Sequence, residues 1–106
     1  MCDAAKVRGL NDAFRKTLLG GRVVVTATIS SRPELPLILN RVRSFADFTE
    51  DNDPYCEHDF GAFEHEGEQI FWKIDYYDSD LAAGSPDPAD PTVTTRVLTI
   101  MLANEY

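Results

Sequence analysis

The two residues best placed to do chemistry together are His58 and Asp75. They lie in the segments 58–65 and 68–77, which alternate apolar and polar residues and are joined by Glu66-Gly67, a dipeptide suited to a tight turn. This pattern predicts a β-hairpin in which His58 faces Asp75 across the two strands. A carboxylate beside an imidazole fixes its tautomer, which suits a general base. The same contact is also typical of a histidine that simply completes its hydrogen bonding beside a sheet. His58 and Asp75 are therefore weak catalytic candidates, and a structural hydrogen bond or a partner contact are the alternatives.

No metal or cofactor is expected. His58 and His65 differ by an odd number, so on one regular strand they point to opposite faces and do not share an ion. The acidic segment TEDNDPYCE (49–57) lacks the spacing of a calcium loop. Cys2 and Cys56 are far apart and match neither a zinc motif nor a disulfide framework, which favours free thiols in a reducing compartment.

Charge is divided unequally along the 106 residues, whose formal net charge is -8. Residues 1–45 hold eight basic and three acidic residues, whereas residues 46–106 hold two basic and fifteen acidic residues. An acidic body repels phosphate backbones, so direct nucleic-acid binding is not expected. A protein or nucleoprotein partner with a basic surface suits this charge, although acidic surface also simply keeps a small protein soluble.

The candidate residues for contact with such a partner lie in the acidic half and include one aromatic side chain. Tyr76 and Tyr77 point opposite ways on a strand, so one of them is expected to be exposed as an anchor. The candidates are Glu50, Asp51, Asp53, Glu57, Asp59, Tyr77 and Asp78.

The hydrophobic spacing predicts six elements. Residues 3–19 form an amphipathic helix that Asp3 begins and Gly20-Gly21 ends. The β-branched run 22–29 is a strand, and residues 36–48 are a short helix, with a strand as the alternative. The hairpin strands 58–65 and 68–77 follow, between surface loops at 49–54 and 78–91. Residues 92–105 form a last helix, with Asp90 as its N-cap and Pro91 at its first position.

These elements predict a single α+β domain over residues 1–106. Its order is α-β-α-β-β-α, with a three-stranded antiparallel sheet and helices packed on one face. We expect Trp72 to lie in the core over Gly61 on the neighbouring strand, and the last helix to bury Leu98 against the sheet.

Several segments are distinctive enough to compare with a known family. They are FADFTEDNDPY, EHDFGAF, IFWKIDYYD, GSPDPADP, TTRVLTIMLANEY and the opening RGLNDAFRKTLLGGRVVVT. They resemble an uncharacterised, mainly alphaproteobacterial family, a domain of unknown function often encoded on plasmids and other mobile elements. The chain departs from it at Cys56, where the resemblance leads us to expect glycine, so Cys56 is not expected to be a shared nucleophile. The resemblance implies that the gene lies among mobile-element genes, and it does not indicate any particular activity.

Small acidic proteins from such neighbourhoods include anti-restriction and anti-CRISPR proteins. The hypothesis is therefore a non-enzymatic binding protein that inhibits a host defence complex through its acidic surface. The alternative is a small enzyme or regulator that uses His58 and Asp75. No apolar run approaches the roughly 20 residues of a membrane helix, and the first residues lack a secretory signal, so a cytoplasmic location is expected.

Overall fold

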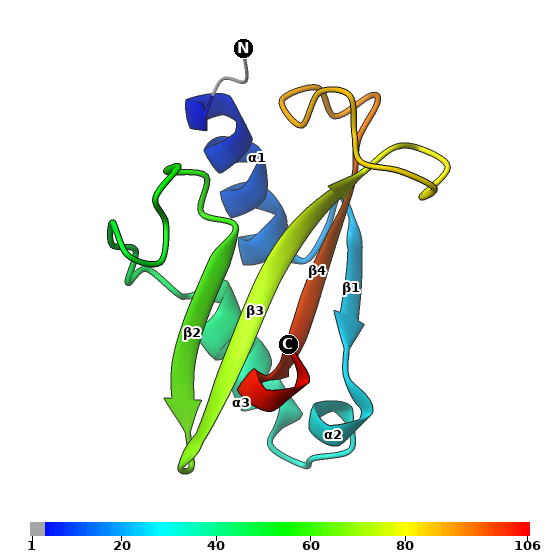
Figure 1. Cartoon of the computed structure of the whole chain (residues 1–106). Coiled ribbons are helices and arrows are strands. Elements are labelled where there is room, and N and C mark those ends of the chain that lie inside the picture. The colour runs from blue at the N-terminus through cyan, green and yellow to red at the C-terminus, as the bar shows by residue number, and fades with distance from the viewer. Residues whose placement is uncertain (1–3) are drawn as a thin grey trace.

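The computed structural model describes residues 4–106 as a four-stranded mixed sheet with helices (Figure 1). The helices are α1 (Ala4–Thr17), α2 (Ala27–Ser30) and α3 (Leu35–Arg43), and a 3-10 turn, η1 (Ala103–Glu105), follows the last strand. The strands are β1 (Arg22–Val25), β2 (Phe60–His65), β3 (Glu68–Tyr77) and β4 (Thr95–Leu102). The proposed roles of Cys2 and of Asp3 as a helix cap fall outside the described residues. None of the described helices is long and apolar enough to span a membrane.

The strand order is β1-β4-β3-β2, in which β1 runs parallel to β4 and the other neighbours are antiparallel. The α+β class is therefore confirmed, but the three-stranded antiparallel sheet is wrong. The additional strand is β4, which the sequence analysis assigned to a helix over residues 92–105.

The last segment was misassigned because it is apolar on both of its faces. Leu98, Ile100 and Leu102 alternate on one face and are buried, while Met101 on the other face is also only 3 % exposed. The apolar residues are therefore consecutive at the end of the strand, and together with Val97 and Leu98 they also match helical spacing. Its many β-branched residues were the signal for a strand. Asp90 begins no helix and instead accepts hydrogen bonds from Thr92 within the loop.

Other predicted element boundaries also differ from those in the structure. The strand expected over 22–29 ends at Val25, and α2 starts two residues later. The expected helix 36–48 is a helix but ends at Arg43. The first helix ends at Thr17, before the expected stop at Gly20-Gly21. The left-handed backbone conformation that follows it is taken by Leu18 (φ 60°).

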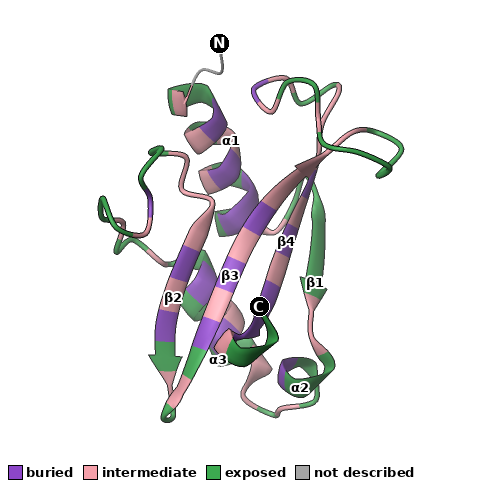
Figure 2. Cartoon of the chain, viewed as in Figure 1, coloured by how far each residue is buried: buried purple, intermediate pink, exposed green. Residues whose placement is uncertain are grey.

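The core lies between one face of the sheet and the helices, as expected (Figure 2). Phe14 of α1, Ile29 of α2 and Ile38 of α3 belong to one buried cluster with Trp72 and Leu98 of the sheet. The opposite face is partly covered by the chain end, where the Tyr106 ring makes edge contacts with Phe60 and Phe71.

The β2–β3 hairpin has the register that a two-residue turn predicts. Gly61 pairs with Trp72 and Phe63 with Ile70, and the turn residues Glu66 and Gly67 both have positive φ. Trp72 is fully buried and lies over Gly61, as expected. A Cβ atom on Gly61 would lie 2.3 Å from the Trp72 Nε1 atom, so glycine is required there by close contact.

Replacement of Gly61 by alanine is expected to lower the free energy of unfolding by about 1–3 kcal/mol, because the new methyl group overpacks the core against the indole of Trp72. Chemical denaturation measures this loss. Gly9→Ala is the matched control, since nothing lies within 4 Å of a Cβ at this helical position. That control should stabilise the chain slightly, since alanine favours a helix by about 1 kcal/mol over glycine. Equal midpoints for Gly61→Ala and the wild type would contradict the close contact.

Candidate functional site

Two acidic loops that are far apart in the sequence lie at the same end of the sheet (Figure 1). One leads into β2 and the other connects β3 to β4. Residues 46–59 and 78–91, which we call the acidic end, contain ten of the eighteen acidic residues and no lysine or arginine. The side chains most open to solvent among them are Asp47, Glu50, Asp51, Asp80 and Asp87.

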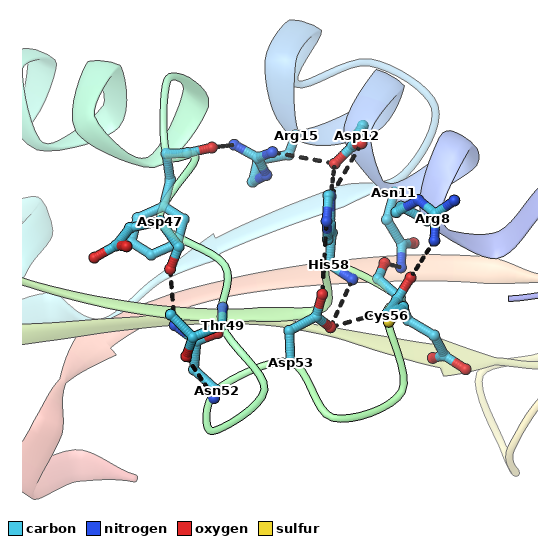
Figure 3. Close-up of polar contacts among 12 residues, drawn as sticks. Arg8, Asn11, Asp12, Arg15, Asp47, Thr49, Asn52, Asp53, Cys56 and His58 are labelled. Carbon is cyan, nitrogen blue, oxygen red and sulfur yellow. Dashed lines mark hydrogen bonds and ion pairs between the residues drawn. The ribbon is translucent and has the colours of Figure 1, made fainter. Parts of the chain in front are cut away.

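His58 is the central side chain of the first loop, but its partners are not those predicted (Figure 3). Its Nδ1 atom lies 2.9 Å from Oδ1 of Asp12 on α1, and its Nε2 atom lies 3.6 Å from Oδ2 of Asp53. The ring stacks on Phe48 with a centroid distance of 3.7 Å and an interplanar angle of 3°. Both ring nitrogens therefore face carboxylates, and one ring face is covered.

The predicted contact between His58 and Asp75 is wrong. Strand β2 begins at Phe60, and His58 before it has φ 54°, which turns its side chain out of the hairpin register and towards α1. Asp75 instead accepts a hydrogen bond from Lys73 at 2.5 Å. Asp75, Lys73 and Tyr77 line a separate surface pocket of about 430 Å³. The two catalytic candidates are therefore not brought together.

Asp53 holds the first loop in its conformation. Its Oδ1 atom accepts hydrogen bonds from the backbone N–H groups of Glu57 and His58, each at 3.0 Å, and the residue is only 6 % exposed. Asn52 adds a second brace, because its side chain donates to the carbonyl of Asp47 and accepts from the backbone N–H of Thr49. The loop is thus fixed by its own side chains.

A buried polar network joins both loops to α1. The Asn11 amide donates to the carbonyl of Glu57 at 3.0 Å and to the Tyr76 hydroxyl at 2.8 Å, and its oxygen accepts from Arg96 at 2.7 Å. Arg96 also donates to the carbonyl of Pro88 in the second loop. The Tyr76 hydroxyl donates to the Glu57 carboxylate, and burial raises the pKa of Tyr76 well above its usual range. One asparagine on α1 therefore positions both parts of the acidic end.

Arg15, one turn further along α1, is 1 % exposed and holds the segment that leads from α3 into the first loop. Its Nη1 atom donates to the carbonyls of Val42, Arg43 and Phe45 at 2.9–3.1 Å. Burial lowers the pKa of its guanidinium, while the hydrogen bond to Asp12 opposes this shift.

The predicted partner-contact residues fall into different environments. Glu50 and Asp51 are exposed, as a contact surface requires. Asp53 and Glu57 are engaged in the internal bonds described above, and Asp78 accepts from the backbone N–H of Ala82.

The two remaining candidates lie away from the solvent-exposed loop tips. Burial and the neighbouring Glu57 raise the pKa of Asp59, which is half-buried. Tyr77 lies half-buried beside Lys73 and Asp75, and Tyr76 points into the network, so the two tyrosines do point opposite ways. Neither is exposed, so the expected exposed anchor is wrong.

Sequence reasoning missed Asp12, Asn11 and Arg15 as organisers of the loops. A signal was present, because Asn11 and Arg15 continue the apolar stripe of Val7 and Phe14 at helical spacing. A polar side chain within an apolar stripe is buried and must find hydrogen-bond partners.

An open surface pocket of about 710 Å³ lies beside His58. Its lining includes Arg8, Phe48, Glu50 and Cys56, and Cys56 is an exposed free thiol. A general base needs a nitrogen that can reach a substrate proton. Because both nitrogens of His58 face Asp12 and Asp53, the geometry favours a structural clamp.

Metal-ligating side chains converge elsewhere. Among residues 4–106, one group of three has ligand atoms within 4.8 Å of one another, namely Glu34, His65 and Glu66, at the opposite end of the sheet from His58. Sequence reasoning did not bring these three together, because Glu34 precedes α3, His65 ends β2 and Glu66 lies in the β2–β3 turn.

Comparison with known proteins gives one match. A family model described as a protein of unknown function, DUF3768, matches residues 23–105, which is more than three quarters of the chain. The match starts at β1 and so leaves out α1, which supplies Asn11, Asp12 and Arg15. No curated protein and no solved structure matches the chain. The chain thus belongs to the DUF3768 family of proteins of unknown function.

Proposed function

We propose that this chain is a non-enzymatic binding protein that docks its acidic end on a basic protein surface. The observation that carries the proposal is that residues 46–59 and 78–91, which contain ten acidic residues and no lysine or arginine, lie at one end of the sheet (Figure 1). The cations beside them are Arg8, which donates to the carbonyl of Cys56, and Lys6, which interacts with Asp90. Charge concentrated on one surface steers association with an oppositely charged partner and excludes partners of like charge.

The rigidity of the loops supports the same proposal. Asp53 and Asn52 brace the first loop. In the second, Asp87 accepts from the backbone N–H of Ala89, and Ser85 and Thr94 are hydrogen-bonded at 2.7 Å. A surface that is already ordered loses less conformational entropy on binding, so more of its interaction energy appears as affinity.

The partner class that fits this charge is a complex that handles nucleic acid, since such complexes carry basic surfaces. Together with the resemblance to mobile-element proteins, this favours a cytoplasmic inhibitor of a host defence complex, of the anti-CRISPR or anti-restriction type. In this proposal the acidic end occupies the surface that nucleic acid would otherwise contact.

The test is affinity capture from a bacterial host lysate at low and high salt, with identification by mass spectrometry. The diagnostic variant reverses three exposed charges in the two loops, Glu50→Lys, Asp51→Lys and Asp80→Lys. It leaves Asp53 unchanged, because that residue holds the loop together. The matched control is Glu64→Lys, an exposed reversal on β2.

We expect a basic protein or nucleoprotein complex to be retained by the wild type and the control at low salt. The loop variant should lose it, and high salt should release it. Retention of the same proteins by the loop variant, at either salt concentration, would contradict a role for the acidic end.

A further inference from the structure

The far end of the hairpin holds a histidine whose ring nitrogen has no hydrogen-bond partner. The Nε2 atom of His65 is buried and makes no hydrogen bond, and the side chain is only 11 % exposed. A buried polar atom without a partner is destabilising and therefore requires a physical reason. The nearest carboxylate oxygen paired with it, Oε2 of Glu66, is 4.0 Å away, too far for a hydrogen bond.

Two carboxylates converge on this imidazole from different elements. Glu66 lies in the β2–β3 turn, where its φ of 50° sets the course of the chain, and Glu34 immediately precedes α3. One ligand atom from each of Glu34, His65 and Glu66 lies within 4.8 Å of the other two. We propose that these three residues form a binding site for a single divalent transition-metal ion of the zinc class.

The donor set selects this class of ion. An imidazole nitrogen with carboxylate oxygens suits Zn²⁺ and its neighbours, whereas Ca²⁺ and Mg²⁺ prefer oxygen ligands alone. Ligands at about 2.0–2.2 Å in a tetrahedron lie roughly 3.3 Å apart. The ligand atoms would therefore move closer together by at most about 1.5 Å on binding. Glu66 is 72 % exposed, so its side chain is free to make most of this movement.

Arg32 is the competing cation, and its contacts leave Glu34 available. Its guanidinium makes two hydrogen bonds to the carboxylate of Glu68 and approaches Glu34 only to 3.9 Å. Paired charge-assisted bonds to one carboxylate are the stronger arrangement. Glu34 is thus loosely held and can turn to a metal ion without breaking the Arg32–Glu68 pair.

Isothermal titration calorimetry with Zn²⁺ alone tests the site. The full chain is used in a Cys2→Ser, Cys56→Ser background, so that thiolates contribute no binding. His65→Gln, Glu34→Gln and Glu66→Gln each remove one ligand, and Glu64→Gln is the control because it changes an exposed carboxylate next to His65.

We expect one Zn²⁺ per chain in the background protein and in Glu64→Gln, with a raised Tm when the ion is bound. Each ligand variant should weaken Zn²⁺ binding at least 10- to 100-fold. That is the loss of affinity seen when a residue that only hydrogen-bonds to a metal ligand is removed. Absence of binding by the background protein, or unchanged affinity in His65→Gln, would overturn the site. Unchanged affinity in both glutamate variants would also overturn the site. The Glu66 side chain is 72 % exposed, so Glu66→Gln is expected to fold and keeps the test valid if His65→Gln does not.

Discussion

Replacement of Arg15 by methionine is expected to lower the free energy of unfolding by about 3 kcal/mol. Arg15 donates to the carbonyls of Val42, Arg43 and Phe45, which end α3 and begin the first acidic loop. Methionine fills similar space but donates no hydrogen bond, so these carbonyls lose a charged donor. A hydrogen bond to a charged group contributes about 1.5–3 kcal/mol, and an unsatisfied buried group costs about 1–3 kcal/mol.

The loss of Arg15 also removes two cation–π contacts. Its guanidinium carbon lies 5.1 Å from the Trp72 ring centroid and 5.5 Å from that of Phe48, the ring that stacks on His58. Urea denaturation measures the change, with Lys16→Met as the control because Lys16 is exposed on the same helix. The control should change stability by no more than about 0.5 kcal/mol. Equal midpoints for the two variants would contradict the role assigned to Arg15.

Leu98→Ala is expected to cost about 2–5 kcal/mol, because it leaves a cavity in the centre of the sheet's buried face. Leu98 is fully buried on β4, pairs with Val23 and Ile74, and belongs to the same core cluster as Trp72. Its position between two strands limits how far the neighbours can collapse into the space.

The matched control for this variant is Leu19→Ala. It deletes the same atoms from a side chain that is 75 % exposed, so its stability should change by less than about 0.5 kcal/mol. Thermal or chemical denaturation of the pair isolates the contribution of burial. A Leu98→Ala midpoint as high as that of the control would show that β4 does not pack as described.

Local signals predicted the hairpin correctly, because Glu66-Gly67 fixes a two-residue turn and the turn fixes the register of both strands. The same register also predicted the pairing of Gly61 with Trp72. The first helix was also predictable, since Val7 and Phe14 lie on one stripe.

The remaining errors arose where tertiary contacts decide the structure. Strand β4 ends in consecutive buried apolar residues, Ile100, Met101 and Leu102, so its hydrophobic spacing fits a helix as well as a strand. Its place between β1 and β3 decides the structure. The contact between His58 and Asp12 joins residues 46 positions apart and depends on a left-handed backbone at His58. Nothing local to His58 indicates that its partner lies on the first helix.

The candidate acidic surface was predictable from charge, and its position at one end of the sheet from the hairpin, but the internal hydrogen bonds of its carboxylates were not. Counting acids identified Glu50 and Asp51, which are exposed, together with Asp53, whose carboxylate is committed to the loop's own backbone. Asp80, which is exposed, was not among the candidates, although Asp78 of the same loop was. The antiparallel pairing of β2 with β3 places the loop before β2 and the loop after β3 at the same end of the sheet (Figure 1).

The most direct test of the central claim is the association rate constant with the captured partner, measured over a range of ionic strength. Reversing Glu50 and Asp51, or Asp80, should slow association, and the combined variant should be slower than either. These changes should alter association more than dissociation, and salt should weaken the effect because the Debye length is only about 8 Å at physiological ionic strength. An association rate that is independent of salt and unchanged by reversing both loops would contradict the account.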